Sequence, residues 1–576
     1  MDDRLTRLES TIDELRGSVR RLEARIALLE GRAIAGPEAD AHAGPATAET
    51  RSPASQPAGR DWHDPIAILS LLGRLFIVLG GAYFLRAMTD AGTVPPTAGV
   101  ALGLVYGLIW LVLADRAGAR LLVPSAVFHG VGAAMVAFPV VLEATTRFKV
   151  LPGPASAVAL TMLTGGLLAV AWRQRIQPLA WVAVVAAIPT SIVILAQTGV
   201  VVPHAFFLIL FGVATLWMGY SLDWLAVRWP VAAVANLVVV GVTARALAQQ
   251  PQESPGVALV VQVTLLGAYL LSIAIRTLVR GRNVIPFEVA QTVAALVVGL
   301  GGALYVTRAT GSGGATLGVA SVIFGAACYG VAFAFIERQQ NRGRNVYFYT
   351  SLAVVFVLVG MARLLPAEPL AGVLAALAVV CCAAWTRIGR LFLLLHGAIY
   401  LAAAAIASGA IGYDIGAVAF GAPGGWALPG AAMLVVLAAA AASAWLAALQ
   451  PDGDGSAYAS APRFAVVLVF VLSAGGALVG YLAPALGGLP DRSIDAGVLA
   501  TIRTGVLAVA TLLVAWIGRH ARFREWGWLV YPLLVGIGIK MVAQDFMHSR
   551  PATMFVALAL YGAALILAPR LRRRQG

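Results

Sequence analysis

The strongest constraint in this sequence is a nearly unbroken series of apolar segments, each about as long as one bilayer crossing. They occupy about 500 of the 576 residues and are joined by loops of only a few residues. A bilayer core about 30 Å thick needs about 20 mostly apolar residues per helix. The pattern predicts an all-α, polytopic helical membrane protein with about 18 spans. The expected spans are 66–88, 94–114, 121–142, 154–172, 178–196, 201–220, 229–248, 256–278, 285–306, 315–336, 345–365, 369–385, 389–408, 428–449, 462–484, 497–517, 526–546 and 552–569.

The least certain parts of this assignment are one span and one segment between spans. The span expected at 369–385 is short, and the segment 409–427 is rich in glycine, which suits a re-entrant or interfacial stretch.

Composition supports the class, because 60% of the residues are hydrophobic and only 12% are charged, about half the fraction usual for soluble domains. Little chain is left outside the bilayer, so no soluble catalytic or nucleotide-binding domain is expected.

The net charge of +14 does not indicate a nucleic-acid partner, because the arginines are spread over many short loops. Membrane lipids with anionic headgroups are the expected partners. The three cysteines Cys328, Cys381 and Cys382 lie in apolar segments without metal-ligand spacing, so neither a metal site nor a cofactor is expected. Arginine accounts for 39 of the 41 basic residues, which favours a bacterial source.

Residues 1–32 are predicted to form a cytoplasmic coiled coil. Apolar residues follow a 3-4 spacing through four heptads, which favours a parallel two-stranded coil and hence a homodimer or a coiled-coil partner bound through residues 5–29. A single amphipathic helix lying on the membrane or on the body of the protein is the alternative, although its mixed charges argue against membrane binding. The heptad residues are Leu5, Leu8, Ile12, Leu15, Val19, Leu22, Ile26 and Leu29.

Three further segments complete the expected domain organisation. Residues 33–64 are rich in Pro, Ala and Gly and are predicted to be a flexible linker. Residues 65–570 are the transmembrane helical domain, and 571–576 are a basic cytoplasmic tail. Loops after even-numbered spans and the tail carry 21 basic residues against 10 on the other side. The positive-inside rule then places both termini in the cytoplasm of a bacterium, with the helices in its inner membrane.

Internal similarity indicates that the spans are repeated helical hairpins. The segment GRLFIVLGGAYFL at 73–85 resembles GRLFLLLHGAIYL at 389–401, and GRNVIPF at 281–287 resembles GRNVYFY at 343–349. Small residues form ridges suited to close helix packing. These are Gly99, Gly103 and Gly107 on one span, and Gly476 and Gly480 on another.

Oppositely charged residues lie close in sequence at several span ends that are expected to face outward. Spacings of four or five residues suggest pairs on one helix face. Such pairs either anchor helix ends at the interface or form an outward-facing pocket for an anionic ligand, such as a lipid headgroup. The candidate ligand-binding pairs are Arg86 with Asp90, Glu143 with Arg147, Arg363 with Glu368, and Lys540 with Asp545. Proton or ion coupling through Glu143 or Asp545 is a third possibility.

Other polar residues within spans are weaker candidates. Glu288 either couples to protons or pairs with Arg280 or Arg282. His129 and His396 lie in two different spans, where packing is favoured over haem ligation. We find no catalytic motif in the sequence, so no catalytic residue is assigned.

The two ends of the membrane domain resemble an uncharacterised bacterial multi-pass membrane-protein family, domain of unknown function twenty-three thirty-nine. At the start, LLGRLFIVLGGAYFLRAMTDAGTVPPTAGVALG at 71–103 carries the similarity, including Gly73, Arg86, Asp90 and Gly92. At the end, 534–567 resembles the family's closing hairpin, in which a Lys and an Asp bracket the turn as Lys540 and Asp545 do here. The resemblance implies an architecture but no activity.

Three functions fit these features. The first is transport or flipping of a small anionic or lipid-linked molecule at an outer-facing polar site. The second is a membrane scaffold or assembly protein that dimerises or recruits through its coiled coil. The third is an outer-leaflet lipid or glycan transferase, although such enzymes usually have larger loops. Enzymatic activity is the least favoured of the three.

Overall fold

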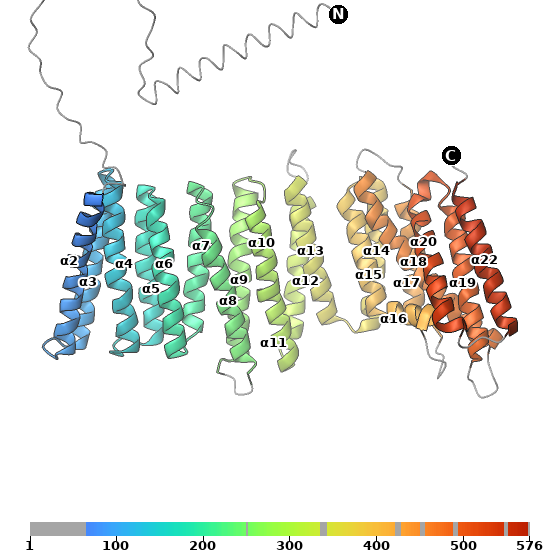
Figure 1. The fold of residues 1–576 in the computed structure, drawn as a ribbon, viewed down its shortest axis with the longest axis horizontal. Coiled ribbons are helices and arrows are strands. Elements are labelled where there is room, and N and C mark those ends of the chain that lie inside the picture. The colour runs from blue at the N-terminus through green and yellow to red at the C-terminus, as the bar shows by residue number, and fades with distance from the viewer. Residues whose placement is uncertain are drawn as a thin grey trace, which may run out of the picture. The chain divides into compact units, whose positions relative to one another are not determined.

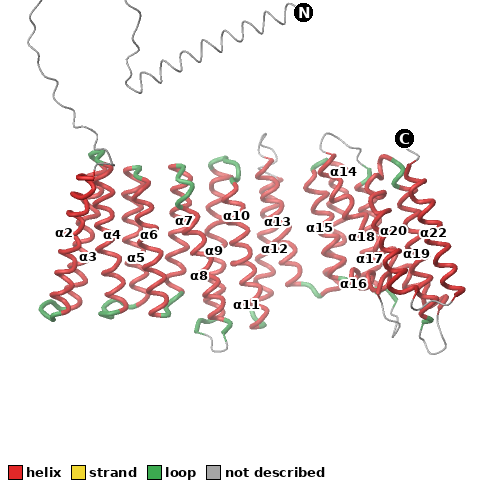
Figure 2. Tube along the Cα trace, in the orientation of Figure 1, coloured by secondary structure: helices red, strands yellow, loops and turns green. Residues whose placement is uncertain are grey.

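The structure is a computed structural model that describes residues 65–248, 252–333, 343–420, 428–449, 456–487, 494–546 and 551–573. The described residues are overwhelmingly helical and contain no β-sheet (Figures 1 and 2). The predicted coiled coil at 1–32 and linker at 33–64 lie outside the described residues, so both stay predictions. The predicted tail begins inside a helix, because the last helix continues to Arg573.

Each range predicted as a span lies on a helix of similar extent, and some helices contain short π-helical or 3-10 segments (η). The first half comprises α2 (Pro65–Asp90), α3 (Pro96–Ala119), α4 (Val123–Thr146), α5 (Gly153–Gln174), α6 (Gln177–Thr198), α7 (Val202–Leu222), α8 (Arg228–Ala246), α9 (Pro255–Ala274) with η1 (Ile275–Val279), α10 (Pro286–Ala295) with η2 (Leu296–Gly301) and α11 (Gly302–Thr310). The second half comprises α12 (Gly314–Val331), α13 (Gly343–Leu364), α14 (Ala367–Ile388), α15 (Leu391–Ala407), α16 (Ala410–Ile415) with η4 (Gly416–Phe420), α17 (Ala431–Ala447), α18 (Ser456–Gly487), α19 (Ala496–Ile517), η5 (Ala521–Leu529) with α20 (Val530–Lys540) and η6 (Met541–Asp545), and α22 (Pro551–Arg573).

Fifteen helices in the described residues are long and apolar enough to cross a membrane, or up to 16 if a bent pair counts as one span. The protein is therefore a multi-pass helical membrane protein. The expected count of about 18 also includes α2, which is not among these fifteen helices, and α17, a shorter apolar helix of 17 residues. The count thus stays a prediction. The short span expected at 369–385 is α14, a full-length crossing of 22 residues.

Helix boundaries follow local chemistry. Proline stands in the first turn of many helices, α3, α6, α9 and α10 among them, where its missing N–H leaves no hydrogen bond unmade. Glycines with positive φ end others, such as Gly199 after α6 and Gly389 after α14. Short loops of this kind make consecutive helices antiparallel, so the loops alternate between two ends of the helices.

Residues Leu71–Gly576 form one compact unit in which helices close in sequence pack side by side (Figure 1). The end that carries the loops between α3 and α4, α5 and α6, and α9 and α10 is called the arginine-rich end below. Arg86 and Asp90 lie near the end of α2, Lys540 is the last residue of α20, and Asp545 is the last residue of η6. All four lie toward the end opposite to the arginine-rich end.

The predicted glycine ridges are packing surfaces. A Cβ atom on Gly107 of α3 would meet the Cβ of Ala137 at 2.8 Å, and one on Gly103 would meet the Val140 side chain at 2.9 Å. The backbone of α3 at these glycines therefore lies directly against side chains of α4. The ridge on α18 has a more specific role. A Cβ on Gly476 would meet the Cα of Asp414 at 2.7 Å, because α16 lies directly against this glycine.

The segment expected to be re-entrant or interfacial, 409–427, is described as far as Phe420. Helix α15 is followed after a short break by α16 and η4, and the two parts are bent by 73° relative to each other. This geometry is that of a broken span or a re-entrant loop, and the second of these is one of the two arrangements predicted for the segment. The repeat at 73–85 and 389–401 is less regular than expected, because Arg74 lies inside α2 whereas Arg390 precedes α15 as its N-cap.

Candidate functional site

A buried polar cluster joins α19, α20, η6 and η4, and we call its members Arg503, Thr504, Lys540, Gln544 and Asp545 the Lys540 cluster. Lys540 Nζ donates to Asp545 Oδ1 at 2.6 Å, to Thr504 Oγ1 at 2.7 Å and to the Ala500 carbonyl at 2.7 Å. Thr504 Oγ1 in turn donates to Asp545 Oδ2 at 2.8 Å. The Lys540 and Asp545 side chains are 4% and 0% exposed, so this predicted pair is a fully enclosed ion pair.

The pair forms because of a local change in helix type. Lys540 and Asp545 are five residues apart, a spacing that does not bring side chains together in a regular α-helix. Residues 541–545 form the π-helical segment η6, whose hydrogen bonds connect residues i and i+5. The π turn therefore places the carboxylate next to the ammonium group. Isolated π turns of this kind are frequent at functional sites.

The segment formed by α16 and η4, called the bent segment below, supplies backbone carbonyl groups that bind the same cluster. Arg503 Nε donates to the Ala417 carbonyl at 2.7 Å, and Arg503 Nη2 donates to the Gly416 carbonyl at 3.2 Å. Gln544 Nε2 donates to the carbonyl of Ala419. The cluster thus binds the carbonyl groups of η4, where the chain departs from regular helix.

Asp414, another charged residue of this region, lies on α16 and is 3% exposed. It accepts a hydrogen bond from Ser473 of α18 at 2.8 Å. Gly476, one turn further along α18, leaves room for its side chain. The bent segment is thus anchored on α18 through Asp414 and on α19 through Arg503.

Four of the predicted site residues come together where α2 and α4 end, away from the arginine-rich end. They are Arg86, Asp90, Glu143 and Arg147, and their pairing differs from the sequence prediction. Arg86 Nη1 lies 2.8 Å from Glu143 Oε1, and Arg147 Nη1 lies 3.2 Å from Asp90 Oδ2. The predicted contact of Arg86 with Asp90 is longer, at 3.9 Å. The side chains are 23–49% exposed, so this network links two helices at a partly solvated position.

Arg363 and Glu368 are not brought together, and no ion pair joins them in the described part of the chain. Pro366 interrupts the helix between them. Arg363 therefore lies in the last turn of α13 and Glu368 in the first turn of α14. Arg363 instead packs its guanidinium against Gly314 at the start of α12. Glu368 is exposed.

Glu288 is paired, but its partner is Arg276 rather than Arg280 or Arg282. Arg276 Nη1 lies 2.9 Å from Glu288 Oε2 and 3.0 Å from Oε1. Tyr220 Oη donates to Oε1 at 2.6 Å, and the Ile285 N–H donates to Oε2 at 2.8 Å. The carboxylate is fully buried and well satisfied, as expected of a structural ion pair.

The two histidines have separate surroundings. His129 stacks on Trp110 at 5.3 Å between ring centroids, whereas His396 contacts the Tyr329 hydroxyl at 3.1 Å. Within the described residues, no group of three or more His, Cys, Asp or Glu side chains is arranged to hold a metal ion. These contacts agree with the packing role that the sequence favoured for both histidines.

Arg503, Thr504 and Gln544, which complete the Lys540 cluster, are not among the site residues predicted from the sequence. Arg503 lies in the interior of the apolar span α19 and is 4% exposed. Its position in the span could have identified it from the sequence, because arginines inside spans are rare and usually functional. Arg276, which falls inside the predicted span 256–278, was likewise not predicted as the partner of Glu288.

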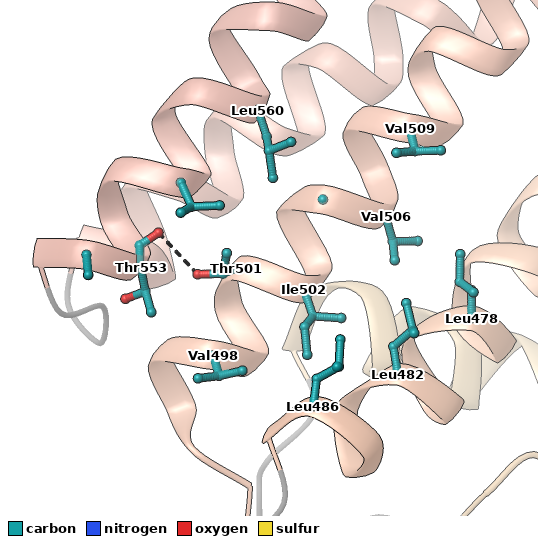
Figure 3. Close-up of a pocket in the computed structure, with 13 residues that line it drawn as sticks. Leu478, Leu482, Leu486, Val498, Thr501, Ile502, Val506, Val509, Thr553 and Leu560 are labelled. Atoms are coloured by element: carbon teal, nitrogen blue, oxygen red, sulfur yellow. Dashed lines mark hydrogen bonds between the residues drawn. The ribbon is translucent and has the colours of Figure 1, made fainter.

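An apolar groove flanks the other side of α19 (Figure 3). It has a volume of about 490 Å³ and lies between α18, α19 and α22. Leu478, Leu482, Ile502, Val506 and Leu560 line it, and Thr501 donates to the Thr553 carbonyl at 3.2 Å at one end. One helix therefore carries a buried charged cluster on one side and an open apolar groove on another.

Comparisons with known proteins add no assignment, since no family model, no curated protein and no solved structure matches this chain.

Proposed function

We propose that this protein is a membrane transporter or flippase for an anionic, lipid-linked molecule, with the Lys540 cluster as its polar site. The observation that carries this function is the enclosed Lys540–Asp545 pair inside spanning helices. Removing an ammonium and a carboxylate from water costs several kcal/mol per ion, so buried pairs are weak contributors to stability. Ionisable residues inside membranes instead usually mark pathways for substrates, ions or protons.

The bent segment supports the same function. In secondary transporters, substrate and ion sites are commonly built from discontinuous helices whose free backbone groups act as ligands. Here Arg503 and Gln544 bind the carbonyl groups of η4, next to a 73° bend. An anionic headgroup that binds Arg503 would compete with these carbonyls, which couples ligand binding to the position of the bent segment.

The groove beside α19 favours a lipid-linked molecule over a small soluble anion. Its lining is almost entirely apolar, as an acyl or polyprenyl chain requires, and Gly505 leaves the α19 backbone uncovered there. Thr501 and Ile502 face the groove, while Arg503 and Thr504 belong to the polar cluster. Head and tail subsites on neighbouring faces of one helix suit an amphiphile.

The proposal also includes the cellular location of the protein and its family. The arginine excess favours the inner membrane of a bacterium with both termini in the cytoplasm, so that the Lys540 cluster lies nearer the outer surface. The resemblance of the two ends favours membership of the uncharacterised family named above. Single cysteines placed in the loops 120–122 and 311–313, probed with an impermeant thiol reagent in intact cells, test the orientation.

A lipid-scrambling assay tests the activity. The full chain is reconstituted into vesicles that contain a fluorescent phosphatidylglycerol, and the fraction reduced by external dithionite is measured. We expect the wild type to expose inner-leaflet probe, and Arg503→Met and the double variant Lys540→Met/Asp545→Leu to lose most of this activity. Arg173→Gln, which changes an arginine whose side chain is 73% exposed, serves as the control.

The result separates the proposal from its main alternative. Equal activity of the inserted cluster variants and the wild type would rule out the Lys540 cluster as the site. If deletion of residues 1–32 abolishes cellular function while insertion and lipid movement persist, the scaffold function based on the coiled coil is favoured instead. Transport predicts that the same deletion leaves both lipid movement and cellular function unchanged.

A further inference from the structure

The two GRNV motifs of the sequence are in direct contact at the arginine-rich end. Asn345, in the second motif, accepts a hydrogen bond from the Val284 N–H at 2.9 Å and donates to the Arg282 carbonyl at 3.0 Å. Asn345 is fully buried, so this contact is a fixed part of the fold. It brings Arg282 in the first motif and Arg344 in the second to neighbouring backbone positions.

Both arginines are exposed, and each is without a carboxylate partner among the described residues. The nearby carboxylate of Glu288 is already bound by Arg276, and no ion pair in the described part of the chain includes Arg282 or Arg344. Arginine binds phosphate oxygens through two parallel N–H groups, and two adjacent arginines suit one phosphate diester.

An apolar groove begins at Arg344, and it is also lined by Val284, which follows Arg282 by two residues. It has a volume of about 610 Å³ and lies between α10 with η2 on one side and α13 on the other. Its lining includes Arg344 at the mouth and, further along the helices, Val289, Val293, Leu296, Leu352 and Val355. Val293 is 54% exposed, although it lies in a helix surrounded by apolar residues.

The length of the groove matches one leaflet of a bilayer. Arg344 and Val355 are eleven residues apart on α13, which corresponds to about 16 Å along a helix. Half of a hydrocarbon core of about 30 Å is about 15 Å. A chain that starts at the arginines and fills the groove would therefore end near the middle of the membrane.

From this arrangement we propose a specific site for an anionic phospholipid. Its phosphate is bound by Arg282 and Arg344, and one acyl chain lies in the groove between α10 and α13. Basic pockets between spanning helices are known to select anionic headgroups. This site lies at the end of the helices opposite to the Lys540 cluster and does not depend on the transport function.

Native mass spectrometry of the full chain tests the site. Protein purified from mixed phosphatidylglycerol and phosphatidylcholine is compared with the variants Arg282→Gln/Arg344→Gln and Val293→Trp, the second of which fills the groove. Controls are Arg120→Gln, an exposed arginine at the same end, and Val297→Trp, an exposed valine in η2 that does not line the groove. We expect one retained phosphatidylglycerol in the wild type and both controls, and at least a tenfold lower occupancy in both test variants.

Three outcomes would overturn the site. Equal retention of the two phospholipids would show ordinary annular lipid without headgroup selection. Equal retention by Val293→Trp and Val297→Trp would show that no acyl chain lies in the groove. Displacement of the lipid by soluble glycerol 1-phosphate at a comparable concentration would identify a free phosphate ester as the ligand.

Discussion

Lys540 Nζ lies 2.6 Å from Asp545 Oδ1, and both side chains are almost completely buried in spanning helices. All three hydrogens of the ammonium group have acceptors, and both carboxylate oxygens have donors. Such a closed arrangement is stable only as a unit, because the removal of either charge leaves the other without compensation. The consequences are measurable in stability as well as in transport.

The Lys540–Asp545 pair should show strong coupling. We expect Lys540→Met alone to lower the free energy of unfolding by about 3–5 kcal/mol, because Asp545 is left buried and unpaired. The double variant Lys540→Met/Asp545→Leu should recover most of this loss. Reversible unfolding in mixed micelles measures both values, and additive effects of the two substitutions would contradict the enclosed pair.

The network of Arg86 should couple across helices. A double-mutant cycle of Arg86→Gln and Glu143→Gln should give a coupling energy of about 0.2–1 kcal/mol, since these side chains are partly exposed. The cycle of Glu143→Gln and Arg147→Gln is the matched comparison and should give a smaller value. A larger value for the second cycle would favour the pairing within one helix that the sequence suggested.

Glu288 should depend on Arg276 and not on the loop arginines. We expect Arg276→Met to destabilise the fold by about 3–5 kcal/mol, because it leaves a fully buried carboxylate without its cation. Arg282→Met should change stability by no more than about 0.5 kcal/mol, as usual for an exposed side chain. The midpoints of thermal unfolding in detergent distinguish the two variants.

Two adjacent glycines of α18 should respond differently to the same methyl group. In Gly476→Ala the new Cβ would meet the Asp414 backbone at 2.7 Å, so we expect a loss of about 1–3 kcal/mol and displacement of α16. In Gly475→Ala the nearest atom would be Val418 Cγ2 at 3.7 Å, an ordinary contact. Similar stabilities of the two variants would contradict the close approach of α16 to α18.

The sequence predicted most helices well and the charged contacts less well. Arg363 with Glu368 and Lys540 with Asp545 have the same spacing of five residues, yet only the second pair forms. Pro366 separates the first pair into two helices, which the sequence shows, whereas the π turn that closes the second leaves no obvious sign in the sequence. Arg503 belongs to the same site although it lies 37 positions before Lys540, so local spacing gives no indication of it.

The sequence by itself determined the class of protein, the approximate position of the helices and the glycine ridges. These features follow from apolar length, proline, glycine and helical periodicity, which act over a few residues. Only the tertiary structure decided which charges meet: Arg86 with Glu143, Arg276 with Glu288, and Arg503 with the carbonyls of η4. The physical reason is that helix packing joins residues far apart in sequence, and a charge pairs with whichever partner that packing brings near. For the buried charges Glu288 and Arg503 such a partner is required.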